Sequence, residues 1–234
     1  MQQARTTQNL FKGDASKITR ALLSNPDTVW SGRNLAKRLN LGQSWVNSIL
    51  NTLEQHRALQ RDKQGRDSLS KLVNPKKLLN TWQTQYNIEL NQYFPYLELK
   101  ENPVQKIKTI CEKENIHYAI TGYAAANLIE KTTYGIFPAM IYLWPGSKEK
   151  KDFQELLVKF ENQHRLIPVR KQANLILIKP FQNDLVFFES QKRRGINMVS
   201  PLQLYLDLCS LERGSETIKA LAHFWQQNGL DYVL

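Results

Sequence analysis

The sequence predicts an α+β protein in which a basic, helix-rich N-terminal part precedes a mixed-sheet α/β domain. Three observations predict this fold class. Apolar residues recur at helical spacing in short segments of the first third of the chain. The formal net charge of +11 is uneven, since residues 1–80 carry +9 and residues 81–234 carry +2. Beyond residue 102, apolar runs typical of strands alternate with helical periodicity, which favours a sheet covered by helices.

Length and composition limit the class of protein. The 234 residues suffice for one large domain or two of ordinary size. No apolar run approaches the length of a bilayer span, and the N-terminus lacks the apolar core of a signal peptide. We therefore expect a cytoplasmic protein with no membrane partner, whose residues 1–13 form a flexible basic arm. Cys111 and Cys209 lie among apolar neighbours and are expected to be reduced core thiols.

Residues 14–75 are predicted to form one small domain. The expected elements begin with a helix from Asp14, a short strand at 28–30, a helix over Gly32–Leu39 capped by Ser31, and a helix from Ser44 to Gln55. Two strands at 58–61 and 68–73 follow, and they form a hairpin with a charged tip centred on Gly65. Two short helices joined by a tight turn and followed by a basic hairpin resemble a winged helix-turn-helix domain, the kind found in many bacterial transcription regulators.

The third helix of this domain has an unusual polar face. Its apolar residues fall on one side, whereas the other side carries hydroxyls and amides without full charge: Ser44, Asn47, Ser48 and Asn51. Such groups can donate to and accept from base edges in a DNA major groove, and amides pair well with adenine. The alternative is an ordinary solvated face. The excess of cations around this helix favours base contacts.

Seven cations near the second helix and the hairpin are candidates for contacts with DNA phosphates: Arg33, Lys37, Arg57, Arg61, Lys63, Arg66 and Lys71. Trp45 lies at the edge of the polar face, where it either packs against the turn or touches a thymine methyl group. Because such a domain reads only a few base pairs, we expect two copies on one double-stranded operator.

Residues 76–102 are predicted to be a linking helix and a connector, in which the aromatics near Tyr93 serve core or interface packing. Residues 103–234 form the α/β domain with C-terminal helices. Its predicted strands are 117–120, 139–144, 165–169, 174–179 and 184–188. Its predicted helices are 103–114, 123–129, 148–160, 201–211 and a last one that follows the separator Gly214-Ser215 and reaches Gln227. The basic cluster 192–195 is expected in a loop.

The turn at Thr121-Gly122 resembles the start of a nucleotidyltransferase domain, in which glycine and hydroxyls hold nucleotide phosphates. The next strand of that fold carries two alternating carboxylates that bind magnesium. Here the strand 139–144 contains no acid, and Asp184 and Glu189 lack a partner at alternating spacing. The sequence therefore predicts a nucleotidyltransferase-like fold without catalytic carboxylates. Thr121-Gly122 is either a simple strand-to-helix turn or a vestigial nucleotide site.

The N-terminal helices, the TGxxAA turn at residues 121–126 and the segment 199–221 together resemble the AbiEi-like antitoxins of type IV toxin–antitoxin systems. In the last segment the resemblance depends on five residues, Ser200, Pro201, Leu204, Asp207 and Gly214. It implies a transcriptional regulator that represses its own operon by binding inverted repeats in double-stranded DNA. It also implies neutralisation of a separately encoded nucleotidyltransferase-like toxin.

The sequence contains no residue pattern typical of a metal site or of a phosphate-binding loop. The four histidines are scattered without a second ligand at metal spacing, and no glycine-rich phosphate loop ending in Lys-Ser/Thr occurs. We expect no catalytic residue, no metal and no cofactor, and hence no enzyme. Two alternatives stay open, namely an active nucleotidyltransferase with a nucleic-acid-binding domain and a protein–protein adaptor that binds a toxin.

Overall fold

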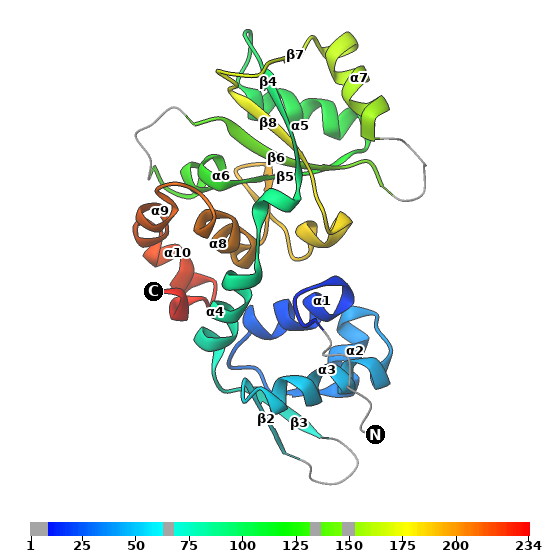
Figure 1. Cartoon of the computed structure of the whole chain (residues 1–234), viewed down its shortest axis with the longest axis vertical. Coiled ribbons are helices and arrows are strands. Elements are labelled where there is room, and N and C mark those ends of the chain that lie inside the picture. Colours follow the sequence, from blue (N-terminus) through cyan, green and yellow to red (C-terminus); the bar gives the residue numbers. More distant parts are fainter. Residues whose placement is uncertain (1–8, 63–67, 132–136, 147–152) are drawn as a thin grey trace, which may run out of the picture. The chain divides into compact units, whose positions relative to one another are not determined.

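The computed structural model describes residues 9–62, 68–131, 137–146 and 153–234 (Figure 1). Its contacts divide the chain into two compact units, Met1–Tyr86 with Trp225–Leu234 and Asn87–Phe224. This division differs from the predicted boundaries in two ways. The second unit begins at Asn87 rather than at residue 103, and the last ten residues belong to the first unit.

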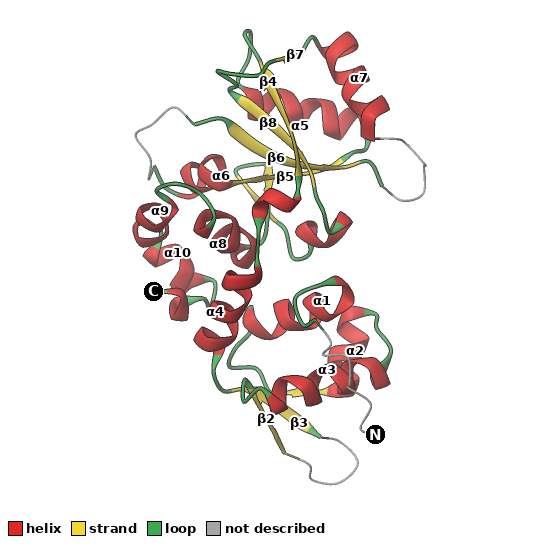
Figure 2. Cartoon of the chain, in the orientation of Figure 1, coloured by secondary structure: helices red, strands yellow, loops and turns green. Residues whose placement is uncertain are grey.

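The first unit consists of short helices and a three-stranded sheet (Figure 2). Its elements are α1 (Gly13–Leu23), β1 (Trp30–Ser31), α2 (Gly32–Leu39), α3 (Gln43–Gln55), β2 (Leu59–Asp62), β3 (Leu69–Leu72), α4 (Pro75–Gln85) and the short 3₁₀ helix η3 (Asp231–Val233). The antiparallel strands lie in the order β1-β3-β2. The predicted order of helices and strands in residues 14–75 is therefore the observed one.

Local signals explain the helix ends. The Ser31 side chain accepts a hydrogen bond from the Asn34 backbone N–H at 3.1 Å and so begins α2. Asn40 ends this helix in the left-handed conformation, with φ of 53°. Asn74 caps α4 in the same way as Ser31 caps α2, and Pro75 takes the first helical position.

The prediction of a flexible arm is wrong for residues 9–12. Leu10 and Phe11 are buried, and the Leu10 carbonyl accepts a hydrogen bond from the Thr19 hydroxyl at 2.9 Å. The Phe11 ring stacks on Trp82, with ring centroids 5.2 Å apart. Apolar side chains thus fix residues 9–12 to α1 and α4, whereas residues 1–8 lie outside the described ranges.

The C-terminal segment packs within the first unit, where it lies beside α4 (Figure 1). Trp225 and Leu230 are almost completely buried. The Tyr232 hydroxyl donates a hydrogen bond of 2.6 Å to the Leu23 carbonyl at the end of α1. Lys76 donates another to the Leu234 carbonyl at 3.1 Å. Residues 225–234 are therefore part of the structure that holds the N-terminal helices together.

The second unit is built on a mixed seven-stranded sheet in the order β7-β4-β8-β6-β5-β10-β9. Its strands are β4 (Gln92–Leu97), β5 (His117–Thr121), β6 (Ala139–Trp144), β7 (Ile167–Pro168), β8 (Leu175–Lys179), β9 (Gln191–Arg193) and β10 (Ile196–Met198). The pairs β6–β8 and β5–β10 are parallel, and the other pairs are antiparallel. A mixed sheet is what the sequence predicts.

The second unit also contains helices. They are α5 (Pro103–Glu114), α6 (Gly122–Ile129), α7 (Phe153–His164), α8 (Pro201–Cys209), α9 (Gly214–Ala220) and the 3₁₀ helices η1 (Ile88–Leu90) and η2 (Asn183–Phe187). The boundary between the two units falls within α10 (Ala222–Gln227). None of the helices in the described residues is long and apolar enough to cross a membrane. Cys111 is buried and Cys209 half-buried, neither forms a disulfide, and burial raises the pKa of both thiols.

Four predicted elements are wrong. The expected strand at 184–188 is the 3₁₀ helix η2. The single helix expected after Gly214-Ser215 begins at Gly214 itself and is interrupted at Leu221. The connector contains β4, an internal strand that lies second from one edge of the sheet. The expected loop at 192–195 is a hairpin, because Arg194 and Gly195 both adopt positive φ (49° and 77°) and so form the two-residue turn that joins β9 to β10.

Candidate nucleic-acid interface

The face of α3 opposite the core carries the four residues predicted to contact bases. The core face is completely buried, with Val46, Ile49, Leu50 and Leu53 each at 0% exposure. On the other face Ser44 and Asn51 are exposed, and Asn47 and Ser48 are half-buried. The helix therefore has the predicted amphipathic division, and its polar groups differ in how far they reach the surface.

Arg61 of β2 binds two of these polar side chains. Its guanidinium donates one hydrogen bond to Asn47 Oδ1 at 3.1 Å and another, shorter one to Asn51 Oδ1. The two asparagines are separated from each other by one turn of α3, and Arg61 lies half-buried on the neighbouring strand. Arg61 is thus not only the phosphate contact that the sequence predicts, since it also positions the amides of the polar face.

Asn47 also packs against the start of α2. A Cβ atom added to Gly32 would lie 2.3 Å from Asn47 Oδ1, so only glycine allows this close approach. The Asn47 amide therefore lies between Gly32 and Arg61, and it helps to hold α2, α3 and β2 together. Among the four predicted base contacts, Ser44 and Asn51 are the exposed pair.

The described cations that are predicted to contact phosphates lie on α2, directly after α3, on β2 and on β3. Arg33, Lys37, Arg57 and Lys71 are all exposed, whereas Lys63 and Arg66 lie outside the described residues. Arg38, another exposed cation of α2, was not predicted from the sequence, and its guanidinium lies 5.2 Å from the centre of the Trp30 ring in β1. Trp45 is 40% exposed, which supports a surface role over packing against the turn.

Thr121 and Gly122 are not exposed at the end of β5. The Thr121 side chain is completely buried, and its hydroxyl donates a 2.5 Å hydrogen bond to Asp207 Oδ2 on α8. Gly122 has φ of +57°, and an added Cβ would lie 3.2 Å from Leu211 Cδ1. The hydroxyl and backbone that a vestigial nucleotide site would use are thus engaged in packing against the segment around α8.

Asp207 is the centre of a buried polar network. From the sequence, this residue stood out only as one of those on which the family resemblance depends. Besides Thr121, its carboxylate accepts hydrogen bonds from the Tyr142 hydroxyl at 3.2 Å and from Gln203 Nε2 at 2.8 Å. An acid in the apolar run LQLYLDLCSL is the sequence signal for such a site, because a fully buried carboxylate requires several donors. The donors themselves come from β5, β6 and α8.

Two further residues of this segment have structural roles. The Ser200 hydroxyl accepts from the Gln203 backbone N–H at 3.2 Å and caps α8, which Pro201 begins. At Gly214 an added Cβ would lie 1.6 Å from the Leu208 carbonyl oxygen, so the chain passes α8 too closely for any side chain. The residues on which the family resemblance depends therefore determine how α8 and α9 pack.

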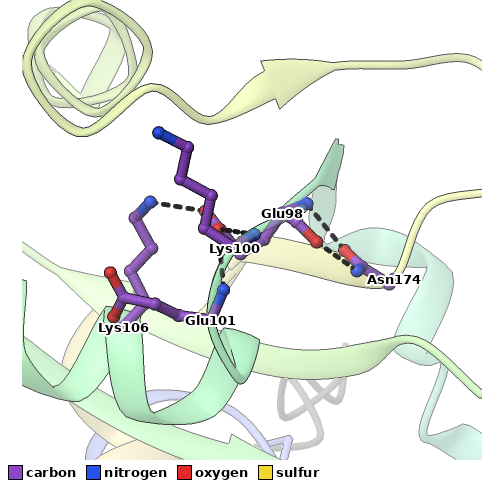
Figure 3. Close-up of polar contacts among 5 residues, drawn as sticks. All are labelled: Glu98, Lys100, Glu101, Lys106 and Asn174. Atoms are coloured by element: carbon purple, nitrogen blue, oxygen red, sulfur yellow. Dashed lines mark hydrogen bonds and ion pairs between the residues drawn. The ribbon is translucent and has the colours of Figure 1, made fainter.

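A second buried acid organises the turn between β4 and α5. Glu98 forms an ion pair with Lys106 at 2.5 Å, and Glu98 Oε1 accepts from the backbone N–H groups of Lys100 and Glu101 (Figure 3). The Asn174 amide pairs with both backbone groups of Glu98, at 2.9 and 2.7 Å. Burial acts to raise the pKa of Glu98, but the hydrogen bonds and the charge of Lys106 outweigh it and lower the pKa.

The described part of the second unit holds no group of three or more His, Cys, Asp or Glu side chains that could bind a metal ion, and the same is true of the described part of the first. On β6, where a nucleotidyltransferase would carry its carboxylates, Ile141, Tyr142 and Leu143 are completely buried. The Glu98 cluster and the Asp207 network are instead hydrogen-bonded structural sites.

Comparison with protein families gives a match over most of the chain. A family model described as "Transcriptional regulator, AbiEi antitoxin, Type IV TA system" matches residues 71–227. No curated protein and no solved structure matches the chain. The matched region begins in β3 and runs through the second unit into α10, so it includes the Asp207 network but not α1, α2 or α3.

Proposed function

Since the chain belongs to the AbiEi antitoxin family, the transcriptional regulators of type IV toxin–antitoxin systems, we propose that its first unit binds double-stranded DNA. The binding is sequence-dependent, and through it the protein represses its own operon. The observation that carries this proposal is the uncharged polar face of α3, on which Ser44 and Asn51 are exposed, together with exposed cations on α2 and β3.

The geometry supports entry of α3 into a major groove. An α-helix fits this groove, and hydroxyl and amide groups on its outer face can reach base edges. Ser44 at the start of α3 and Asn51 two turns later are exposed on this face. The winged helix arrangement, in which the second helix of a pair reads bases and a hairpin contacts the backbone, accounts for both sets of side chains.

The charge of the first unit supports a polyanionic partner. Residues 1–80 carry nearly all of the net positive charge of the chain. Arg33 and Lys37 lie on α2, Arg57 follows α3, and Lys71 lies on β3, so cations flank the polar face from three elements. Neutralisation of phosphates by such cations releases counterions, and it supplies affinity and orientation without sequence preference.

Specific repression requires more than one copy. One helix covers only a few base pairs, and useful selectivity within a genome needs a longer site. We propose that two copies bind an inverted repeat, one on each half-site. The second unit then serves as the part that neutralises the toxin, as the antitoxin family implies, and it does so without catalysis. The buried apolar residues of β6 and the engagement of Thr121 by Asp207 support this non-enzymatic role.

The test is equilibrium binding to fluorescent duplexes from the region upstream of the operon and to shuffled duplexes of equal length. Ser44→Ala and Asn51→Ala should weaken binding to the upstream duplex by about tenfold each and leave binding to shuffled DNA unchanged. Lys37→Ala and Lys71→Ala should weaken binding to both duplexes equally and lower the slope of log K against log salt by about 1.

Two results would contradict the proposal. The first is equal affinity of the wild-type protein for both duplexes at every salt concentration. The second is an equal loss on both duplexes for Asn51→Ala, which would assign this residue to backbone contacts. For the second unit, magnesium-dependent transfer from labelled nucleoside triphosphates that disappears in Asp207→Asn would show that it is an enzyme.

A further inference from the structure

We propose that Arg61 fixes the side-chain amides of α3 so that Asn51 presents its N–H donors to DNA, and that the base pair it faces therefore carries guanine rather than adenine. The inference rests on the proposed DNA-binding function and deepens it, because it names the base that the polar face selects. It also changes the expectation from sequence alone, in which asparagine on a recognition helix pairs with adenine.

The orientation of the amides follows from the chemistry of arginine. A guanidinium group has only N–H donors and no acceptor. The amide atom that faces Arg61 must therefore be the oxygen, both at Asn47 and at Asn51. Rotation of either amide by 180° would place N–H groups against N–H groups and would lose the hydrogen bond. One cation thus sets the orientation of two asparagines.

Asn47 and Asn51 then play different parts. Asn47 Oδ1 lies against Gly32 and the side chain is half-buried, so this residue anchors Arg61 to the packing of α2 and α3. Asn51 is exposed one turn further along the helix. Because the amide is planar and its oxygen faces Arg61, its NH₂ group is directed away from the guanidinium. Asn51 is therefore the residue that offers donors at the surface.

The preference for guanine follows from the groups on base edges. Adenine pairs with asparagine through two bonds, in which the amide oxygen accepts from N6 and the amide nitrogen donates to N7. Because its oxygen faces Arg61 and its NH₂ group faces outward, Asn51 cannot align both groups with the edge of adenine, and the nearby guanidinium opposes the N6 amino group. Guanine presents two acceptors, N7 and O6, to the same position. Cytosine presents an amino donor and is disfavoured for the same reason as adenine.

The experiment measures base preference, which a purely structural role of Arg61 would leave unchanged. Binding of the wild-type protein to a pool of duplexes randomised at each position of the upstream site is followed by sequencing of bound DNA. Guanine should dominate at one position in each half-site. Arg61→Ala frees the amide, and at that position alone the ratio of adenine to guanine should rise about tenfold.

Two further variants separate the effect of amide orientation on base preference from the effect of losing a positive charge. Arg57→Ala removes an equal charge next to α3 without touching Asn47 or Asn51, so it should weaken all duplexes and leave every base preference unchanged. Asn51→Asp keeps an acceptor for Arg61 but replaces the outward donor by an acceptor. It should therefore lose the guanine preference by about tenfold and favour cytosine, whose N4 group donates. Circular dichroism verifies that each variant is folded.

The outcomes distinguish the inference from the function on which it rests. If the wild-type protein selects no sequence from the pool, the proposed function fails. If it selects a sequence but Arg61→Ala changes affinity without changing the preference at any position, the proposed function stands and Arg61 is a phosphate contact only. Selection of adenine by the wild-type protein at the position that responds to Asn51→Asp would also overturn the inference.

Discussion

The Thr121 hydroxyl and the Asp207 carboxylate are 86 residues apart in the chain and are joined by a buried hydrogen bond of 2.5 Å. This bond links the end of β5 to α8, where Tyr142 and Gln203 also donate to the same carboxylate. The acid is completely buried, so the packing of α8 against the sheet depends on these donors remaining paired.

Replacement of Asp207 should be among the most destabilising changes in the second unit. Asp207→Ala leaves three buried donors without their acceptor, and we expect it to lower the free energy of unfolding by at least about 3 kcal/mol. Asp207→Asn retains one acceptor oxygen and should cost less. Urea unfolding followed by circular dichroism measures both. The exposed Asp184 serves as control, and Asp184→Ala should change stability by less than about 0.5 kcal/mol. Equal stability of all three variants would contradict this role.

Gly214 should tolerate no side chain. Its Cβ would lie 1.6 Å from the Leu208 carbonyl, so Gly214→Ala must push the start of α9 away from α8. We expect a loss of about 3 kcal/mol or more in the free energy of unfolding. At Gly42, where φ is −64° and nothing lies within 4 Å of an added Cβ, the same replacement should cost well under half as much. Thermal unfolding of the two variants side by side tests the difference.

Glu98 should make stability depend on pH. Its pKa is lower in the folded protein than the ordinary value of 4.5, because the hydrogen bonds and the ion pair with Lys106 outweigh the effect of burial. The stabilising contribution is therefore complete above the pKa of the unfolded chain, and it is lost as the pH falls through the lower pKa of the folded protein. Glu98→Gln should be less stable than the wild type at pH 7.

The difference between the two proteins should shrink as the pH falls below the ordinary pKa of 4.5 and through the lower pKa of the folded protein. Urea unfolding at several pH values measures it. Glu101→Gln, in the same turn but at an exposed position, should follow the wild-type dependence throughout. A constant difference between Glu98→Gln and the wild type over this range would show that the carboxylate is not the titrating group.

Deletion of residues 225–234 should destabilise the first unit. It removes the buried side chains of Trp225 and Leu230 and the hydrogen bond from Tyr232 to Leu23. Burial of two large side chains is worth several kcal/mol, so limited proteolysis should cut the truncated protein within α1 to α4 much faster than the wild type. Tyr232→Phe removes the hydrogen bond alone and should cost about 1 kcal/mol. Equal protease resistance of the truncated and full-length proteins would show that the segment is dispensable.

The sequence predicts best the elements whose signals are local. The bounds of α2 and α3 follow from the Ser31 cap, the left-handed Asn40 and the apolar spacing of Val46, Ile49 and Leu53, all within a few residues. The family resemblance was likewise confirmed, and the residues that carried it, such as Asp207 and Gly214, prove to determine the packing of α8 and α9.

The errors arise where the decisive contacts are distant. The segment around Phe94 becomes the internal strand β4 because it pairs with β8, some 80 residues later, and no local pattern shows that pairing. The basic cluster around Arg194-Gly195 is typical of a loop. In the structure these two residues form the turn of a hairpin, and its strand β9 is an edge strand of the sheet.

Long-range contacts also limit what the sequence tells about the candidate interface. The polar face of α3 is visible from spacing, but the contact of Arg61 with Asn47 and Asn51 joins positions 14 and 10 residues apart on two different elements. It depends on how β2 packs beside α3. Without that contact the amides are free to rotate, and adenine is the reasonable expectation.

The return of the last ten residues to the first unit has a consequence for biosynthesis. A ribosome releases Trp225 and Leu230 only after it has made the whole second unit, so α1 and α4 lack these packing partners until that point. A chain that stops before residue 225 would therefore lack a completed first unit. Binding of the proposed operator would then be confined to molecules that already contain the second unit.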